Sequence, residues 1–266
     1  MNAIRRSAEL LSRGRVFRRR FSRQYGGAQL FVTPECGLRY LRSNLESVDT
    51  CLLNLAKELV QPNSVTWDIG ANLGLFSFAA AGLAGSAGKV FAVEPDTYLV
   101  DLLRRSSRLK NDGAAPVTVI PCAVSESFGV LDFHIAQRAR AANSLSVFEG
   151  GQGGGVRETQ SVLSVTLDWL ATQIPPPDLI KIDAEGADLR VLRGASRLLD
   201  EHKPDLICEV FEGIAAEVTA FLFDKGYTLY NAELPRRERR PLTQATYSTL
   251  AVSSQKVRST AMAFDA

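Results

Sequence analysis

The stretch from Val65 to Gly74 carries the residue types of a nucleoside-binding turn. It reads Val-Thr-Trp-Asp-Ile-Gly-Ala-Asn-Leu-Gly, so an apolar strand is followed by an acid, Asp68, and then by glycines. Glycine permits positive φ angles and lets the backbone approach a ligand closely. A second apolar run ends in Glu94, twenty residues after Gly74. Its carboxylate can accept hydrogen bonds from the two ribose hydroxyls, and the spacing predicts one half of a nucleoside-binding α/β unit.

The glycine spacing also indicates which nucleoside is bound. A dinucleotide-binding turn has the pattern G-x-G-x-x-G and holds a pyrophosphate at the start of the next helix. This turn instead reads D-x-G-A-N-x-G, and its acid would repel a pyrophosphate but attract the sulfonium and ammonium groups of S-adenosylmethionine. We expect that cofactor at Asp68, Gly70, Asn72 and Gly74, with Glu94 on the ribose. The alternative is a glycine-rich turn that binds nothing.

A second group of chemically active residues lies in the run Lys-Ile-Asp-Ala-Glu-Gly at 181–186. A strand buried on both faces of a sheet reads as an apolar run, and Lys181 interrupts such a run. Side chains alternate along a strand, so Lys181 and Asp183 point to the same face, where the lysine finds a partner. Asp183 and Glu185 follow the end of this strand, and Glu209 stands near the end of the next one.

Ligands of doubly wound sheets bind at the carboxyl ends of the strands. We expect the strands that end in Asp68, Asp183 and Glu209 to be neighbours, so that these acids, Glu185 and Lys181 meet at one edge of the sheet. Two other interpretations stay open. The residues can form an ion-pair lattice with no ligand, or Asp183 and Glu209 can provide oxygen ligands for magnesium.

Strands and helices alternate along the chain, and this order predicts a doubly wound α/β fold with a mostly parallel sheet and helices on both faces. Apolar spacing of three to four residues predicts helices, which we expect at 45–60, 73–83, 97–110, 187–199 and 213–225, with a short one from Leu167. Apolar runs between turn signals predict strands, which we expect at 65–69, 89–94, 117–120, 129–135, 161–166, 179–183, 206–210, 227–231 and 246–252.

The charge of the 266-residue chain is unevenly distributed. Residues 1–23 hold eight arginines and one acid, a net +7, which leaves −5 for the rest of a chain whose total is +2. Such a segment predicts contact with an anionic membrane surface, and it also resembles a mitochondrial presequence; the alternative is a solvated arm. We expect an arm and an irregular lead-in over 1–43, a catalytic domain over 44–255 and a tail over 256–266.

Composition excludes several other classes of protein. No apolar run approaches the roughly 18 residues of a membrane-spanning helix, and the acidic remainder does not favour a nucleic-acid enzyme. The cysteines form no C-x-x-C pair, which argues against a zinc site or a disulfide scaffold and for a reducing, cytoplasmic location. Neither histidine stands at a predicted strand end, and the glycine-rich segment 137–157 is a candidate mobile loop. The four cysteines are Cys36, Cys51, Cys122 and Cys208.

Three segments together resemble the FkbM family of S-adenosylmethionine-dependent methyltransferases: Asp68–Gly74, Ala92–Pro95 and Leu179–Ala195. The most specific part is the string K-I-D-x-E-G-A, which continues into V-L-x-G-A; Asp188 stands where the family more often has glutamate. The similarity extends over about residues 45–211. It implies a Rossmann-like sheet of the class I methyltransferase type. It also implies O-methyl transfer to a hydroxyl of a sugar, a polyketide or a similar metabolite.

The chemistry implied by this resemblance assigns roles to particular residues. Methyl transfer is an in-line displacement that depends on the placement of the acceptor oxygen, and the acceptor must lose a proton. We expect Asp183 to be the base, with Glu185 as second choice, and Lys181 to orient Asp183 or to stabilise the alkoxide. Cys122 and Ala123 should border the adenine.

Three rival functions remain. A nicotinamide oxidoreductase is disfavoured because the G-x-G-x-x-G pattern is absent. A non-catalytic cofactor-binding or scaffold protein on the same fold is disfavoured by the intact set of acids. A metal-assisted methyltransferase would use Asp183 and Glu209, and measurement of activity with a chelator separates it from the metal-free enzyme.

Overall fold

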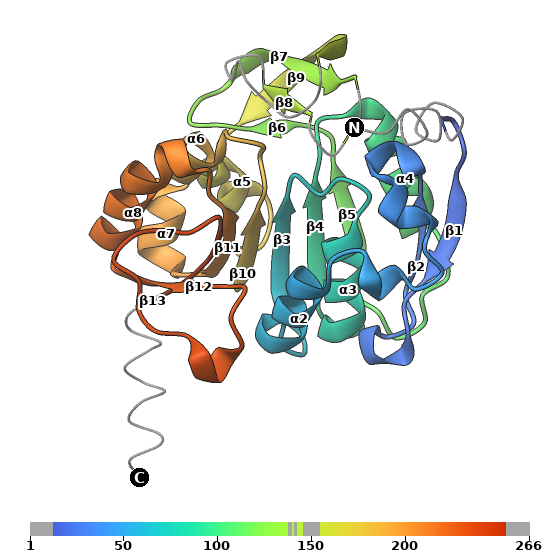
Figure 1. The fold of residues 1–266 in the computed structure, drawn as a ribbon, viewed down its shortest axis with the longest axis horizontal. Coiled ribbons are helices and arrows are strands. Elements are labelled where there is room, and N and C mark those ends of the chain that lie inside the picture. Colours follow the sequence, from blue (N-terminus) through green and yellow to red (C-terminus); the bar gives the residue numbers. More distant parts are fainter. Residues whose placement is uncertain (1–12, 138–139, 141–142, 146–154, 254–266) are drawn as a thin grey trace.

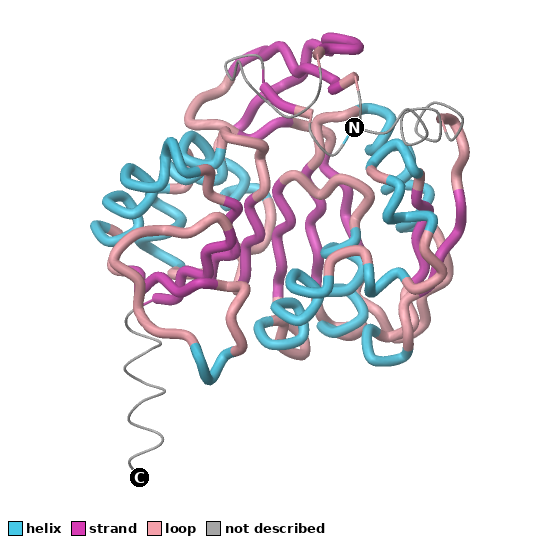
Figure 2. The backbone as a smooth tube through the Cα atoms, in the orientation of Figure 1, coloured by secondary structure: helices cyan, strands magenta, loops and turns pink. Residues whose placement is uncertain are grey.

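The computed structural model describes residues 13–137, 140, 143–145 and 155–253. A seven-stranded sheet runs through the middle of the molecule between two layers of helices, and a four-stranded sheet lies over one end of it (Figure 1). Figure 2 shows the strands of the main sheet in magenta between the cyan helices. Its order is β12 (Tyr227–Asn231), β13 (Ser248–Ser253), β11 (Asp205–Glu209), β10 (Leu179–Ile182), β3 (Val65–Ile69), β4 (Lys89–Val93) and β5 (Val117–Ile120).

The five consecutive strands from β11 to the edge strand β5 are parallel, and β13 is antiparallel to both of its neighbours. In the main sheet, the chain forms β3 first and extends the sheet through β4 and β5. It then returns and places β10 on the other side of β3. This reversal creates a crevice at the carboxyl ends of β3 and β10, where ligands of such sheets bind. The predicted doubly wound fold is confirmed. The strands near Asp68, Asp183 and Glu209, which are β3, β10 and β11, are neighbours as predicted.

Helices cover both faces of the main sheet. Apolar side chains of α2, α3 and α4 pack on one face, and those of α5, α6, α7 and α8 pack on the other. The bounds are α2 (Thr50–Leu59), α3 (Leu75–Ala84), α4 (Thr97–Ser107), α5 (Leu167–Gln173), α6 (Asp188–Arg193), α7 (Ser196–His202) and α8 (Ala215–Asp224). No helix in the described part of the chain is long and apolar enough to cross a bilayer.

Two predicted helices are divided in the structure. The one predicted over 45–60 consists of the 3-10 turn η4 (Leu45–Ser47) and then α2, because the side chain of Asp49 accepts the Leu52 N–H and starts a new helix there. The one predicted over 187–199 is divided into α6 and α7. The carboxylate of Asp168 accepts two backbone N–H groups at the start of α7, which gives that helix an N-terminus of its own.

A separate four-stranded mixed sheet, in which β6 and β9 are parallel, covers the carboxyl ends of the main strands. The sequence analysis did not distinguish its strands from those of the main sheet. Its longest pair, β7 with β9, is antiparallel, and β9 begins at Val156 rather than at 161. The glycine-rich residues 146–154 and the predicted tail at 256–266 lie outside the described residues. The order of this sheet is β6 (Ala123–Val124), β9 (Val156–Val165), β7 (Gly129–Ala136) and β8 (Ser144–Leu145).

The arginine-rich segment near the N-terminus folds onto the domain. The strands β1 (Phe17–Arg20) and β2 (Gln29–Val32) form an antiparallel hairpin beside α4 (Figure 1), and the Phe31 N–H donates to the hydroxyl of Ser106 at 2.8 Å. Phe21 and Leu30 are buried in the same core as α4. The expectations of a solvated arm over 13–23 and of irregular structure throughout 24–43 are therefore wrong.

The segment after the hairpin consists of short 3-10 turns. Residues 1–12 lie outside the described part, and the membrane contact, the presequence and the domain boundary at residue 43 stay predictions. The turns η2 (Pro34–Cys36) and η3 (Leu38–Leu41) follow β2, whereas η1 (Arg23–Tyr25) lies between β1 and β2. Two more turns precede α8 and β13, η6 (Glu212–Ile214) and η7 (Arg236–Glu238).

Candidate active site

The glycine turn between β3 and α3 lies directly against the end of β10. Gly70 has a φ of +72°, and a Cβ atom at this position would lie 1.9 Å from the carbonyl oxygen of Asp183. Gly74 has a φ of +83°, and a Cβ there would lie 2.7 Å from the ring of Phe78. Only glycine fits both positions. At Gly70 the cause is the close approach of the ends of β3 and β10, and at Gly74 it is the packing of Phe78.

Glu94 closes the turn from the end of β4. One of its carboxylate oxygens accepts the Asn72 N–H at 2.8 Å, and the other accepts the Asp96 N–H at 2.9 Å. The side chain is buried, and this burial raises its pKa to about 7 despite the two backbone donors. The geometry fixes a carboxylate whose remaining lone pairs face the space above β3 and β4.

That space is an open pocket between the ends of the main strands and the four-stranded sheet. It has the chemistry of a site for an adenosine with a positively charged substituent: a buried carboxylate, a glycine turn free of side chains and apolar walls. The predicted residues that line it are Gly70, Asn72, Glu94, Cys122, Ala123, Asp183 and Glu185. The predicted residues outside its wall are Asp68, Gly74, Lys181 and Glu209.

Beneath the pocket, Lys181 joins the ends of β3 and β10. Its ammonium lies 3.2 Å from a carboxylate oxygen of Asp68, 3.3 Å from one of Asp183 and 2.8 Å from the carbonyl oxygen of Gly70. Burial opposes the charge, but the carboxylates of Asp68 and Asp183 hold the pKa of Lys181 above its ordinary value. The predicted partnership of Lys181 with Asp183 is confirmed, with Asp68 as a second, fully buried partner.

The two candidate bases differ in their surroundings. The side chain of Asp183 is 26% exposed and holds its place through Lys181. Glu185 has a φ of +47°, which is unusual for a residue with a side chain. Burial and then the charges of Asp183 and Glu209 raise the pKa of Glu185 to about 8, so this group carries a proton at neutral pH.

A second buried cation, Arg140, lines the pocket on the side of Glu94, and the sequence reasoning missed it. Its guanidinium donates to Asp96, lies 3.5 Å from a carboxylate oxygen of Glu35 and stacks 4.5 Å from the ring centre of Tyr98. Asn143 donates to the same Asp96 at 2.9 Å. No spacing rule could have found this cluster, because its members lie far apart in the sequence.

Glu209 has a partner that the sequence also did not indicate. The hydroxyl of Tyr247, the residue before β13, donates to its Oε2 atom. Burial and the charge of Asp183 raise the pKa of Glu209. Within the described ranges, no three or more histidine, cysteine or acidic residues are grouped as metal ligands, and the alternative of a metal at Asp183 and Glu209 stays a prediction.

Comparison with known proteins identifies two curated relatives. A hexuronic acid methyltransferase, AglP, of Haloferax volcanii is 27% identical over 192 residues, which cover 70% of this chain and 73% of the relative. The methyltransferase sdnD of Sordaria araneosa is 29% identical over 190 residues, 61% of this chain and 73% of the relative. Among solved structures, a methyltransferase FkbM from Methylobacillus flagellatus is 17% identical with a TM-score of 0.46, covering 82% of this chain and 58% of its own.

The family comparison covers most of the site described above. Residues 68–229 match the methyltransferase FkbM domain, more than half of the chain. The matched segment contains the glycine turn, Glu94 and the run from Lys181 to Glu185. The chain therefore belongs to the FkbM methyltransferase family, and it is an S-adenosylmethionine-dependent methyltransferase.

Proposed function

We propose that the enzyme methylates a hydroxyl oxygen of a sugar, a polyketide or a similar metabolite, with Asp183 as the general base. The observation that carries this proposal is the position of Asp183, a partly exposed carboxylate at the edge of the cofactor pocket whose orientation is fixed by a buried ammonium. An alcohol is a poor nucleophile until it loses its proton, and a carboxylate within hydrogen-bond reach can remove that proton as the new bond forms.

The cofactor residues follow from the pocket wall. The bound S-adenosylmethionine supplies an electrophilic methyl group. In our proposal Glu94 accepts the ribose hydroxyls, the turn at Gly70 and Asn72 faces the methionine portion, and Cys122 and Ala123 border the adenine. Asp68 acts from below, because its carboxylate is buried against Lys181 and neutralises part of its charge.

Asp183 is a better base than Glu185 for a physical reason. The pKa of Glu185 near 8 leaves it protonated at neutral pH, so it donates rather than accepts a hydrogen bond there. Asp183 keeps one oxygen toward Lys181 at 3.3 Å, and its other oxygen takes the proton of the acceptor hydroxyl. Lys181 already contacts three oxygens, so we assign it to the positioning of Asp183.

The relatives support the class of acceptor. AglP is named a hexuronic acid methyltransferase, and a sugar of this kind presents several hydroxyl groups. The test is to incubate the enzyme with S-adenosylmethionine and a panel of glycans and hydroxylated metabolites. Mass spectrometry then detects products that have gained one methyl group, and fragmentation locates it. A methyl group on nitrogen or carbon overturns O-methyl transfer, and activity that disappears with a chelator favours the metal-assisted alternative at Asp183 and Glu209.

A further inference from the structure

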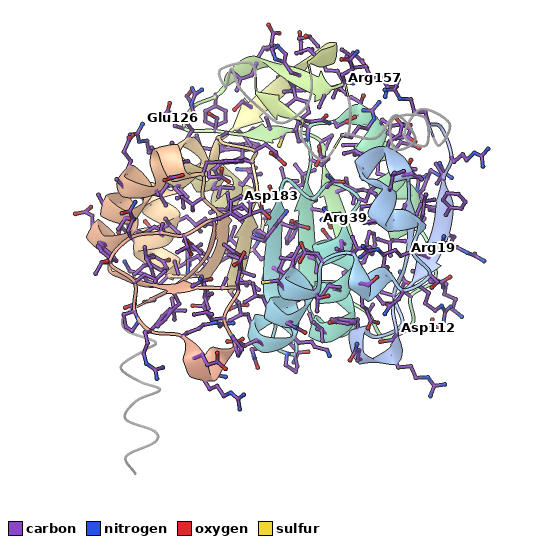
Figure 3. All side chains as sticks on the ribbon, viewed as in Figure 1. Arg19, Arg39, Asp112, Glu126, Arg157 and Asp183 are labelled. Carbon is purple, nitrogen blue, oxygen red and sulfur yellow. The ribbon has the colours of Figure 1, made fainter. Side chains whose placement is uncertain are left out.

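The ends of β10 and β11 place Asp183 beside Glu209. In the register of these parallel strands Lys181 faces Ile207 and Ile182 faces Cys208, and the next pair in this series is Asp183 with Glu209. Figure 3 shows Asp183 at the upper edge of the main sheet, between its two halves. The cofactor pocket extends from Asp183 over β3 and β4, and Glu209 does not line it. In-line transfer requires the acceptor on the far side of the methyl group, so the acceptor approaches over β10 and β11.

On that side, the ring of Tyr247 is held in place and still open to solvent. Its hydroxyl donates to Glu209 at 2.5 Å, its carbonyl oxygen accepts the Val210 N–H at 2.7 Å, and its ring meets that of Phe211 edge to face at 5.9 Å. Despite these contacts Tyr247 is 53% exposed. A large aromatic surface that is fixed beside a catalytic carboxylate is suited to pack against the C–H groups of a ring.

Glu209 also retains hydrogen-bonding capacity. Tyr247 donates to its Oε2 atom, and among the described residues no donor contacts its Oε1 atom. Neighbouring strands lie about 4.8 Å apart, so the carboxylates of Asp183 and Glu209 can contact two hydroxyls of the same small molecule. One hydroxyl gives its proton to Asp183, and the adjacent hydroxyl donates a hydrogen bond to Glu209.

We propose that Tyr247 and Glu209 form the acceptor subsite and that they select an uncharged ring with hydroxyls on two neighbouring carbons. The proposal rests on the proposed O-methyl transfer, because it assigns the second hydroxyl relative to the one that reacts. An uncharged ring is favoured because the subsite combines the carboxylates of Asp183 and Glu209 with one cation among the described residues, Lys181, whose contacts are already occupied. An acceptor with its own carboxylate would be repelled here.

The test measures binding and turnover separately. Methyl α-D-mannopyranoside is the diol probe, cyclohexanol lacks the second hydroxyl, and methyl β-D-glucuronide adds a carboxylate. Saturation-transfer NMR on the enzyme loaded with S-adenosylhomocysteine measures binding, and transfer of labelled methyl groups measures KM and kcat. We expect the mannoside to bind in preference to the other two probes.

Variants locate the subsite. Tyr247→Ala should weaken mannoside binding by about five- to tenfold, the order of one aromatic contact, without change in cofactor affinity. Tyr247→Phe should lose less, because it keeps the ring. Glu209→Gln should raise the KM for the mannoside and leave that for cyclohexanol unchanged. The matched control is Trp169→Ala, since Trp169 is 41% exposed, is paired edge to face with Phe128 at 5.7 Å and lies outside the pocket wall; it should change nothing.

Four outcomes overturn the subsite: no binding of the mannoside, equal binding of cyclohexanol, tighter binding of the glucuronide, or unchanged binding in Tyr247→Ala. These results are distinct from a failure of the proposed function. If the mannoside binds through Tyr247 but no tested hydroxyl is ever methylated, O-methyl transfer fails and the subsite stands. If hydroxyls are methylated with equal KM in the wild type and Tyr247→Ala, O-methyl transfer stands and the subsite fails.

Discussion

Two buried cations lie at the pocket, and each contacts two carboxylates. The two pairs of carboxylates differ in their exposure to solvent. Lys181 joins Asp68 and Asp183, and the side chain of Asp183 is 26% exposed. Arg140 joins Asp96 and Glu35, whose side chains are 0% and 7% exposed. Asp183 lines the pocket and reaches solvent, so a ligand can contact it, whereas Asp96 and Glu35 are sealed and do not line the pocket.

The sequence positions of the partners show the same contrast. Lys181 and its partners come from the ends of two adjacent strands, which the main sheet would bring together in any case. Arg140 connects the N-terminal segment through Glu35, the start of α4 through Asp96 and the small sheet through Arg157, which is 2.8 Å from Glu35. We infer that the Lys181 cluster serves chemistry and that the Arg140 cluster fastens three separate segments over the pocket.

The largest expected effect comes from Asp183→Asn. The substitution keeps the shape of the side chain, and Lys181 keeps Asp68 as a counter-charge, so the protein should fold and bind S-adenosylmethionine normally. The rate of methyl transfer should fall by about a hundred- to ten-thousandfold, the usual contribution of a general base. Turnover and calorimetric titration of the cofactor measure the two effects. If the variant stays active, the base lies elsewhere and Glu185 is the next candidate; if it unfolds, the Lys181 cluster is structural.

For Arg140→Met we expect a loss of stability, whereas for Asp183→Asn we expect a loss of rate with normal folding. Removal of the cation leaves the buried carboxylate of Asp96 without its guanidinium partner and leaves Glu35 with Arg157 alone, which should cost about 3–5 kcal/mol of unfolding free energy. The matched control is Arg105→Met, because Arg105 lies 3.6 Å from Asp101 at an exposed position and should cost less than about 1 kcal/mol. Urea unfolding of the three proteins measures the difference. Equal stability of the two variants would contradict the fastening role of Arg140.

The same contrast explains what could be predicted from sequence. Lys181 and Asp183 are two residues apart on a strand, and the alternation of side chains together with the strand-end rule was enough to bring them, Asp68 and Glu209 together. Arg140 lies 44 residues from Asp96 and 105 from Glu35. Its position depends on the fold of the small four-stranded sheet, whose strands no local pattern distinguishes from those of the main sheet.

The N-terminal hairpin shows a second limit. Its arginines dominate the composition of residues 13–23, although Phe17 and Phe21 in that run contact the core. In β1 the arginines alternate between more and less exposed positions, and in β2 the buried residues Leu30 and Val32 alternate with half-buried ones. The many arginines obscured the alternation of buried and exposed positions in these strands. In addition, four residues per strand are too few to identify a strand from alternation alone.

Glu94→Gln should have a smaller effect than either cluster variant. The amide keeps the volume of the side chain but loses the charge, and its nitrogen cannot accept a hydrogen bond, so cofactor affinity should fall by about 1.5–3 kcal/mol, the range for hydrogen bonds to charged groups. Calorimetric titration with S-adenosylhomocysteine measures it. Glu126→Gln is the control, because Glu126 pairs with Arg190 at the surface (Figure 3), away from the pocket. Equal affinity of both variants would remove Glu94 from the site.

Per group and per pH unit, the smallest effect is the dependence of stability on pH. Burial raises the pKa of Glu94 and of Asp188 to about 7, above the value near 4 of an unfolded carboxyl group. Between these values the folded protein holds protons that the unfolded chain has released. The resulting stability is complete below pH 4 and is lost as the pH rises toward 7, by at most about 1.4 kcal/mol per pH unit for each group.

Cofactor binding should depend on pH in the opposite direction. A protonated Glu94 has lost the charge that accepts the ribose hydroxyls, so affinity for S-adenosylhomocysteine should rise as the pH increases through 7, while the free protein becomes less stable. Chemical unfolding and calorimetric titration between about pH 6 and 8, one unit on either side of the pKa of Glu94, measure the two slopes. Glu94→Gln should abolish the dependence of affinity on pH. It should reduce the dependence of stability on pH without abolishing it, because Asp188 still has a raised pKa. Slopes of the same sign in the wild type would show that Glu94 does not bind the cofactor as a carboxylate.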